Sequence, residues 1–221
     1  MSTIGIIGGT GSQGKGLGYR FAQGGHEVIL GSRSETRAVD AADGLGERLT
    51  GQGSIRGATN AKAAEAGDVV LLAIPFDGHD ELVAELAPQL AGKTVISCVN
   101  PLGFDKRGPY GLDLGPTSAA EIAQGLVPDA HVVGAFHHVS AVTLMSDAEA
   151  LDHEDVLVCG DDAAAKELVI GLASTVTGKP GVDAGALRLA RQLEPLTAVL
   201  ISVNKKYKVR SGIAVVRTAL P

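Results

Sequence analysis

Three glycines near the N-terminus have the spacing of a phosphate-binding turn. Gly9, Gly11 and Gly14 form the pattern G-x-G-x-x-G, between an apolar run at residues 4–7 and a helical pattern at residues 15–24. Such a turn lets backbone N–H groups approach a pyrophosphate, and the start of the helix offers unpaired donors and a positive dipole end. The segment therefore predicts a dinucleotide site.

The surroundings of the turn make it more specific than a glycine pattern alone. Thr10, Ser12 and Gln13 complete the turn, and a second strand-like run at residues 26–30 closes a unit of about thirty residues. A chain with 30 glycines produces some such patterns by accident, but the order of strand, turn, helix and strand is the one that dinucleotide-binding units have. The alternative is a tight strand-to-helix turn without a ligand.

The end of the second strand indicates which dinucleotide binds. NAD sites place a carboxylate there for the ribose hydroxyls, whereas a 2′-phosphate needs donors and positive charge. This chain has Ser32 and Arg33, and Arg37 lies four residues after Arg33. If Ser34 opens the next helix, the two guanidinium groups can converge on one side of it. We therefore expect NADP as the cofactor; the alternative is that both arginines are solvated surface charges.

Later candidates follow apolar runs that read as strands. They are Ile74, Pro75 and Phe76, then Asn100, Pro101 and Leu102, and finally Phe136, His137, His138 and Val139. In open α/β sheets ligands bind outside the carboxyl ends of the strands, which is where these segments are expected to lie. Each has a simpler interpretation: the prolines terminate strands, Phe76 is a core aromatic, and the histidines are a satisfied surface pair.

Strand-like runs alternate with helical patterns along the chain, which indicates a mainly parallel, doubly wound α/β sheet of the Rossmann type. The expected strands are 3–7, 27–30, 54–56, 69–74, 94–98 and 132–136. We expect a nucleotide-binding domain at residues 1–150 and a small C-terminal α/β lobe at 151–221, with helices at 162–176 and 186–204. The segment LTAVLISV in the last helix is apolar on all sides, so we expect the first lobe or a partner subunit to bury it.

Composition narrows the classes of function. The 221 residues carry a net charge of −6, but residues 186–221 are basic, with 7 Lys and Arg against 1 acidic residue. The acidic remainder and the lack of interleaved aromatics argue against nucleic-acid binding. No run of about 20 apolar residues and no signal region is present, so a cytoplasmic protein without membrane contact is expected. Cys98 and Cys159 stand in separate strand-like runs as expected buried thiols, and no metal site is expected.

The chain also lacks one familiar catalytic pair. Short-chain dehydrogenases move a proton with Tyr-x-x-x-Lys, and none of the tyrosines here has a lysine four residues on. Gly160, Asp161 and Asp162 could be an acid/base or metal pair, but a helix cap is the favoured interpretation.

Seven segments of the chain together resemble the NADPH-dependent oxidoreductases of the deazaflavin coenzyme F420. They are GGTGSQGKG, GSRS, LLAIPF, SCVNPL, VVGAFHHVSA, VCGDD and VDAGALRLARQLEPLT. The resemblance covers nearly the whole chain in order. It implies reversible hydride transfer between NADP and F420 by a homo-oligomer, with alignment of the two cofactors in place of a catalytic side chain. We expect the C-terminal lobe to complete the deazaflavin site and to form the subunit interface. Its basic residues, among them Lys205 and Arg210, would attract the anionic side chain of the deazaflavin; the alternative is a solvated face or one that docks a partner subunit.

The resemblance also implies roles for single residues. Residues 10–13 match the phosphate loop, and Thr10, Ser32, Arg33 and Arg37 match the 2′-phosphate site, where some members have lysine in place of Arg37. Residues 74–76 and 100–102 match the path from adenosine to nicotinamide, and residues 137–139 match the deazaflavin ring site. Two alternatives stay open: an NADP-dependent reductase of a small imine or ketone, which needs a proton donor such as a histidine or C-terminal lysine, and a non-catalytic NADP-sensing domain.

Overall fold

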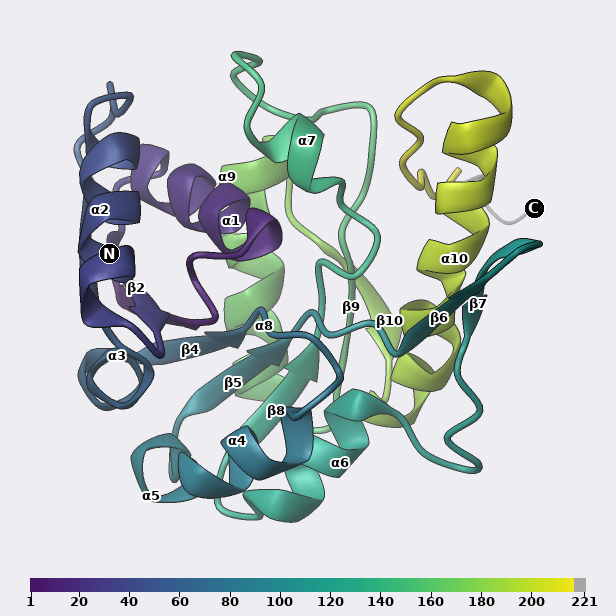
Figure 1. Cartoon of the computed structure of the whole chain (residues 1–221), viewed down its shortest axis with the longest axis horizontal. Coiled ribbons are helices and arrows are strands. Elements are labelled where there is room, and N and C mark those ends of the chain that lie inside the picture. Colours follow the sequence, from purple (N-terminus) through teal and green to yellow (C-terminus); the bar gives the residue numbers. More distant parts are fainter. Residues whose placement is uncertain (217–221) are drawn as a thin grey trace, which may run out of the picture.

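One eight-stranded sheet organises the chain in a computed structural model that describes residues 1–216 (Figure 1). Its strand order is β10-β9-β8-β5-β4-β1-β2-β3. The strands are β1 (Thr3–Ile7), β2 (Glu27–Ser32), β3 (Ser54–Thr59), β4 (Val69–Leu72), β5 (Thr94–Ser97), β8 (His131–Gly134), β9 (Leu157–Gly160) and β10 (Val182–Gly185). A separate antiparallel hairpin consists of β6 (Leu102–Asp105) and β7 (Gly108–Gly111).

The first six strands of this sheet are all parallel, as the alternation of strands and helices predicts. The chain then reverses, so that β9 pairs antiparallel with β8 and β10 pairs parallel with β9. The predicted Rossmann-type, mainly parallel sheet is confirmed. The strand expected at 132–136 ends at Gly134, and two residues later Phe136 has a left-handed backbone with φ 63°, which an extended strand excludes.

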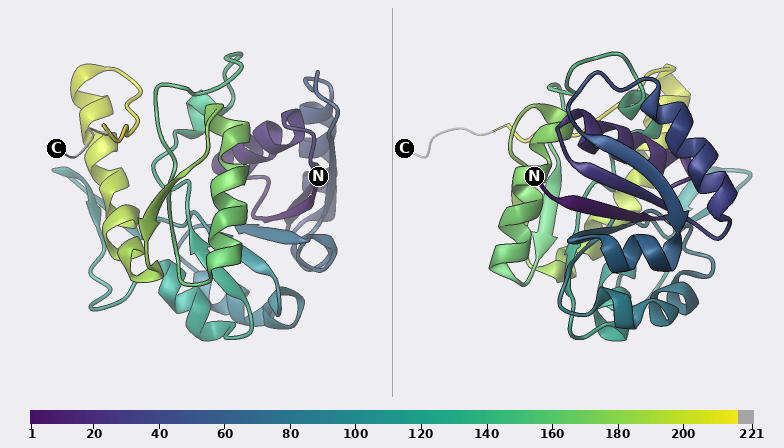
Figure 2. Two further views of the ribbon diagram at one scale, coloured as in Figure 1. Left: turned by 180° about the vertical axis from the view of Figure 1, so that it is seen from behind. Right: turned by 90° about the vertical axis from the view of Figure 1, so that its left-hand side faces the viewer.

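Helices cover both faces of the sheet (Figure 2). They are α1 (Ser12–Gln23), α2 (Glu35–Gly46), α3 (Asn60–Ala66), α4 (His79–Glu85), α5 (Ala87–Leu90), α6 (Ala119–Leu126), α7 (Ala141–Leu144), α8 (Ala163–Leu172), α9 (Ser174–Thr177), the 3-10 turn η1 (Leu187–Leu189) and α10 (Ala190–Tyr207). The helix expected at 162–176 is two helices, and the one expected at 186–204 starts as the 3-10 turn. Asp162 caps α8 by accepting from Ala165 N at 2.8 Å, so the cap interpretation of this motif is confirmed.

Two apolar layers form the core, one on each face of the sheet. The first joins α1, α2 and α8 to the sheet through residues such as Phe21, Leu45 and Val169. The second layer packs the helices α3, α4, α5 and α6 and the start of α10 against the other face, through residues such as Val83 and Leu193. Residues after 150 belong to both layers and extend the same sheet, and the division into domains 1–150 and 151–221 stays a prediction.

Helix α10 stands at the edge of the molecule beside the hairpin (Figure 1). The two elements pack closely, since a Cβ added at Gly111 would come 2.6 Å from Pro195 Cβ.

Within residues 1–216, no helix has both the length and the apolar character that a bilayer crossing requires.

Candidate functional site

The glycine turn has the close packing that a dinucleotide loop requires. Gly8 adopts φ 74°, and Gly9 N donates to Gly31 O at 2.8 Å, which ties the turn to the second strand. A Cβ at Gly14 would lie 2.7 Å from Gly9 Cα, so the helix can approach the loop only with glycine at that position. Gly11 precedes α1 and makes no side-chain cap, so the first-turn N–H groups lack intrahelical partners and suit an anion.

A residue that sequence reasoning missed holds this turn in place. Asn60, buried at the start of α3, accepts a hydrogen bond from Gly8 N through Oδ1 at 3.2 Å. Ile74 packs on the same glycine, since a Cβ at Gly8 would come 2.8 Å from Ile74 Cγ2. Thr10 and Ser12 lie on the loop and in the first turn of α1, where both are at least partly exposed.

Three of the predicted 2′-phosphate residues, Ser32, Arg33 and Arg37, lie at the junction of β2 and α2, where Ser32 is buried. Ser32 ends β2 and its Oγ accepts from Ser34 N at 3.2 Å, while Ser34 caps α2 by accepting from Arg37 N. Arg33 and Arg37 are exposed, and neither forms an ion pair with an acidic side chain among the described residues. Their guanidinium groups are therefore available to a phosphate.

The second part of the candidate site, after the glycine turn, is a pocket of about 540 Å³ that opens at the carboxyl ends of β5 and β8. Five predicted residues line it: Gln13, Asn100, His137, His138 and Val139. Its opposite wall consists of residues of α10 and the segment that follows it, including Thr197, Leu200, Ile201, Asn204, Lys205, Arg210 and Ser211. Of these, only the basic Lys205 and Arg210 were expected near the deazaflavin, and the other residues were not predicted. The spacing of the helix residues is one face of a helix.

Hydrogen bonds from three elements fix the loop after β8. Asn100 Nδ2 and Thr197 Oγ1 both donate to His137 O, at 2.7 and 2.8 Å. Gln13 Nε2 donates to Phe136 O at 3.3 Å and to Val139 O at 3.2 Å. Gln13 thereby connects the phosphate turn to the second pocket, so a ligand at one site lies beside the other.

The two histidines are neutral. His137 is buried above Gly134, where a Cβ would come 3.2 Å from its Cε1, and burial together with the neighbouring His138 lowers the pKa of His137 to about 3. His138 is also buried, which lowers its pKa, and its Nε2 lies 2.6 Å from Asp155 O. Because a carbonyl only accepts, His138 carries its proton on Nε2. Neither ring suits general acid catalysis near neutral pH.

Several predicted residues lie outside this pocket. Pro75 is exposed, and Phe76 is half-buried and stacks on His79 with ring centroids 5.8 Å apart. Pro101 is buried, and its carbonyl accepts from Leu112 N.

Two predicted placements are wrong. Leu102 does not end a strand of the main sheet but begins the hairpin. The ring of Phe136 does not face a ligand: it is fully buried and packs edge-on against Phe21 at 5.7 Å, because the left-handed backbone turns it into the core.

The cysteines are free and buried, as predicted. Cys98 lines the pocket, and its Sγ lies 3.3 Å from Leu72 O. Burial raises the pKa of each thiol to about 12, so neither is a thiolate nucleophile at physiological pH. The described residues contain no cluster of three or more His, Cys, Asp or Glu side chains suited to a metal.

Two buried ionisable side chains outside the prediction hold elements near the site together. Arg20 of α1 donates to the carbonyls of Leu144 and Ala148, at 2.7 and 2.6 Å, and so holds the segment that follows α7. Glu194 of α10 accepts from Ala119 N and Ala120 N at the start of α6. A lone charged residue in a helical pattern gives no signal of such a role.

Comparison with known proteins agrees with the geometry. A family profile described as "NADP oxidoreductase coenzyme F420-dependent" matches residues 3–101. The F420-dependent NADP reductase of Methanocaldococcus jannaschii is 39% identical over 93% of both chains, and that of Methanothermobacter thermautotrophicus is 37% identical over 95% of this chain and 92% of its own.

Solved structures give the same result. A putative F420-dependent NADP reductase from Arthrobacter sp. FB24 superposes with a TM-score of 0.82 and 27% identity, covering 98% of this chain and 100% of its own. Pyrroline carboxylate reductase of Plasmodium falciparum covers 94% of this chain and 66% of its own with a TM-score of 0.58, and at 12% identity it shows the fold alone. The near-complete coverage by the methanogen enzymes shows that this chain belongs to the family of F420-dependent NADP reductases.

Proposed function

We propose that the chain catalyses reversible, direct hydride transfer between NADP(H) and the deazaflavin ring of coenzyme F420. The observation that supports it best is the pair of adjoining sites joined by Gln13, one built like a phosphate loop and one a pocket at the same edge of the sheet. Nicotinamide and deazaflavin supply the redox chemistry, because C4 of one can pass a hydride to C5 of the other.

The residues of the chain then have three tasks. The turn from Gly9 to Gly14, with Ser32, Arg33 and Arg37, suits the pyrophosphate and 2′-phosphate of NADP. The pinned loop after Phe136 and the facing side of α10 suit a flat ring beside the nicotinamide. Holding two reactants in one orientation and excluding water supplies the rate enhancement without an acid or base.

The two alternatives differ in what they require of the pocket. Reduction of an imine or ketone needs a proton donor. Both histidines of the pocket are held neutral by burial, which leaves Lys205 as the candidate donor among the lysines and histidines that line it. A sensing domain needs no second pocket, and the one here is large enough for a cofactor-sized ring.

One assay tests the proposal against both alternatives. The purified protein is mixed with NADPH and oxidised F420, and the visible absorbance of the deazaflavin is followed. The proposal predicts loss of that absorbance at a rate proportional to the enzyme concentration. Unchanged absorbance with folded protein that still binds NADPH would refute it.

A homo-oligomer and a cytoplasmic location stay predictions. The hairpin and α10 support the first, since Phe104 and Tyr207 are each 69% exposed and Val199 is 55% exposed. Apolar side chains gathered on neighbouring elements suit burial between copies of the chain. Light scattering of the purified protein, with Phe104→Ser as the variant, should show a dimer or larger species that the substitution weakens.

A further inference from the structure

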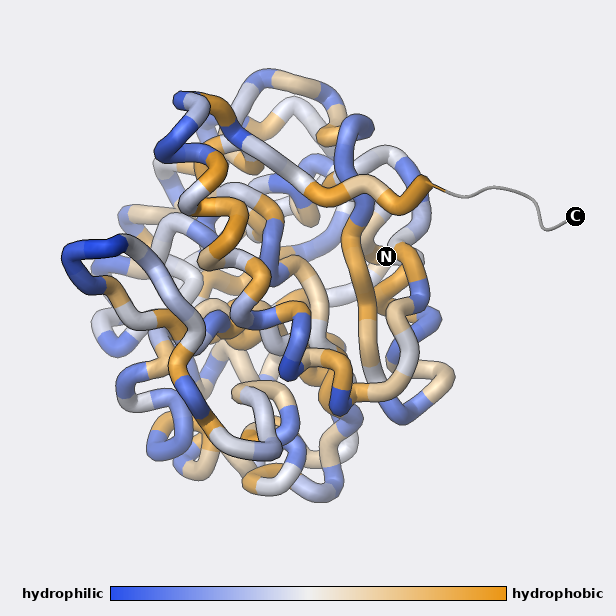
Figure 3. The backbone as a smooth tube through the Cα atoms, turned by 90° about the vertical axis from the view of Figure 1, so that its right-hand side faces the viewer, coloured by the Kyte–Doolittle hydropathy of each residue, from blue (hydrophilic) through white to orange (hydrophobic). Residues whose placement is uncertain are grey.

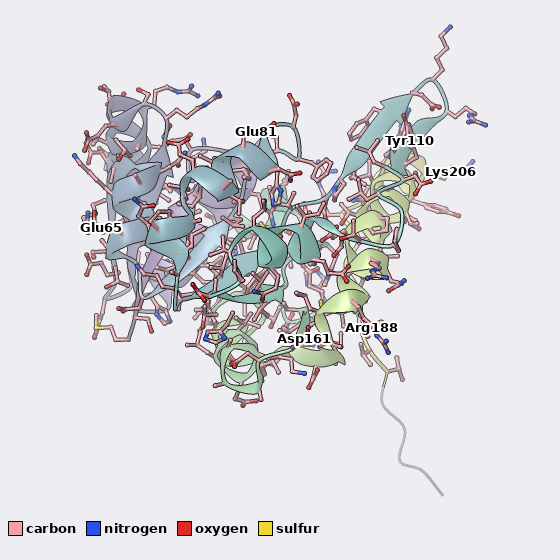
Figure 4. All side chains as sticks on the ribbon, turned by 90° about the horizontal axis from the view of Figure 1, so that it is seen from below. Glu65, Glu81, Tyr110, Asp161, Arg188 and Lys206 are labelled. Carbon is pink, nitrogen blue, oxygen red and sulfur yellow. The ribbon has the colours of Figure 1, made fainter. Side chains whose placement is uncertain are left out.

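The basic C-terminal region of the sequence divides into two groups of side chains. Arg191 pairs with Glu121, with Nε 2.7 Å from Oε2, and Arg188 lies at the far end of α10 from Lys206 (Figure 4). Lys205 and Arg210, in contrast, line the 540 Å³ pocket. Neither is ion-paired to an acidic side chain within residues 1–216.

The pocket itself is free of acidic side chains. Its lining includes Lys205 and Arg210 but no Asp or Glu among the described residues, in a chain that has 25 acidic residues. The two histidines there are neutral, so they do not change the sign of the charge that the pocket carries. The pocket therefore carries positive charge within a molecule of net charge −6, which favours an anionic ligand at its mouth.

The segment that carries Arg210 is held in place rather than left loose. After Lys208, in the left-handed conformation, Ser211 donates to Asn204 Oδ1 from both N and Oγ, at 2.6 and 2.8 Å. The segment then pairs with residue 155, where Asp155 N donates to Ile213 O at 2.7 Å. Figure 3 shows this return of the chain from the hydrophilic end of α10 into an apolar stretch.

The position of the charges along α10 gives the pocket two chemically distinct ends. Thr197 binds the loop of His137 at one end, and Lys205 lies eight residues further along the same face. With a rise of 1.5 Å per residue, that separation is about 12 Å. A ligand with a flat ring at the first end would place a linked side chain toward the second.

We infer that Lys205 and Arg210, with Ser211, form a subsite for the phosphodiester and carboxylate side chain of the deazaflavin substrate. This inference rests on the proposed function and adds to it the part of the substrate that the C-terminal segment recognises. Charge-assisted hydrogen bonds to phosphate are the strong contacts that such a pair of cations forms.

The chain offers a matched control for the test. Lys205→Gln with Arg210→Gln removes two positive charges from the pocket, and Lys206→Gln with Lys208→Gln removes two from neighbouring positions that do not line it. Both variants and the unmodified enzyme are assayed with full-length F420 and with the tail-less deazaflavin that ends at the ribityl group. Thermal melting and the KM for NADPH report on folding.

The inference predicts that the pocket variant raises the KM for full-length F420 at least tenfold and leaves the KM for the tail-less form and for NADPH unchanged. In the unmodified enzyme, rising salt should weaken full-length F420 more than the tail-less form, and the pocket variant should lose this difference. An equal effect of the control variant, or equal salt response of both deazaflavins, would overturn the subsite while leaving hydride transfer intact. Failure of the unmodified enzyme to reduce either deazaflavin would refute the proposed function instead.

Discussion

Asn100 and Thr197 meet at one acceptor although 97 positions separate them: both donate to His137 O, and Asn100 Nδ2 also lies 3.1 Å from Thr197 Oγ1. Asn100 follows β5, and Thr197 is in the middle of α10. The contact therefore fixes the distance between the sheet edge and the helix that forms the opposite wall of the pocket.

Thr197→Val tests this connection, because valine keeps the shape of threonine and removes the hydroxyl. One hydrogen bond to a buried carbonyl contributes about 1 kcal/mol, so we expect the hydride-transfer rate or the F420 affinity to fall by five- to tenfold. Single-turnover absorbance measurements give both quantities. Thr197→Ser keeps the donor and should behave like the unmodified enzyme; a loss in Thr197→Ser that Thr197→Val does not show would mean that the methyl group, not the hydroxyl, matters.

Cofactor choice should depend on Arg33 and Arg37. Replacing both by Gln removes charge-assisted bonds of roughly 1.5–3 kcal/mol each, so NADP affinity should drop by at least about tenfold while NAD affinity barely changes. Titration of both cofactors into the double variant measures this. A parallel loss for NAD and NADP would mean that the arginines do not read the 2′-phosphate.

His138 should position the ring without donating a proton. His138→Asn keeps a polar side chain and removes the imidazole, and the single-turnover rate should stay within about tenfold, below the range typical of a lost acid or base. Because burial holds the pKa of His138 below its ordinary value of about 6.5, the rate of the unmodified enzyme should show no titration above that pH. A hundredfold loss that follows a pKa near 6–7 would restore the imine-reductase alternative.

His137→Asn calls for a different expectation on stability. The His137 ring is buried in the core, so its loss leaves a cavity and should lower the free energy of unfolding. The hydride rate of the remaining folded protein should nevertheless stay within the same tenfold, since the backbone carbonyl that Asn100 and Thr197 bind is unchanged.

Stability should decrease as pH rises, because two carboxyl groups are buried. Burial raises the pKa of Glu154 to about 7 despite the nearby Lys179, and burial likewise raises that of Glu194 to about 7. Between about pH 4.5 and 7, each of these carboxyl groups is protonated in the folded state and ionised in the unfolded chain. Rising pH across this window therefore lowers the free energy of unfolding by up to about 3 kcal/mol per group. The stabilising contribution of each protonated carboxyl is thus fully present below about pH 4.5 and is lost as the pH rises to about 7.

Glu154→Gln checks the contribution of one group. Urea unfolding at pH 5 and pH 8 should show about half of the original pH dependence in this variant, with Glu194 responsible for the rest. The exposed Glu81→Gln serves as the control and should leave the dependence unchanged. If Glu154→Gln keeps the full dependence, the buried carboxyl is not the titrating group.

The extent of prediction from sequence differs between the two halves of the site. The glycine turn and the arginines were predictable because a dinucleotide unit is local: residues 3–37 form one strand-turn-helix-strand segment and the start of the next helix. Thr197 was not singled out, and Lys205 was predicted only as one of several basic residues that attract the deazaflavin side chain, because only the tertiary fold brings α10 opposite the loop of His137. Their spacing on one helix face, together with Asn204, was the available signal.

The missed elements have a similar explanation. The strands β6, β7 and β10 are four residues long and read LGFD, GPYG and VDAG, without the apolar alternation that marks a strand. The pairing of β10 with β9 depends on the sheet edge that the rest of the fold provides. Phe136 looked like a site residue from its neighbours, and only its left-handed backbone reveals that the ring turns inward.

The central claim is direct hydride transfer between two aligned rings, and isotope transfer measures it. The enzyme is given NADPH carrying deuterium at either the pro-R or the pro-S position of C4, together with oxidised F420, and the reduced deazaflavin is analysed by NMR. Direct transfer predicts that one of the two labelled forms delivers its deuterium to C5 of F420 without loss to water. Reduced F420 that carries only solvent hydrogen at C5 from both forms would contradict it.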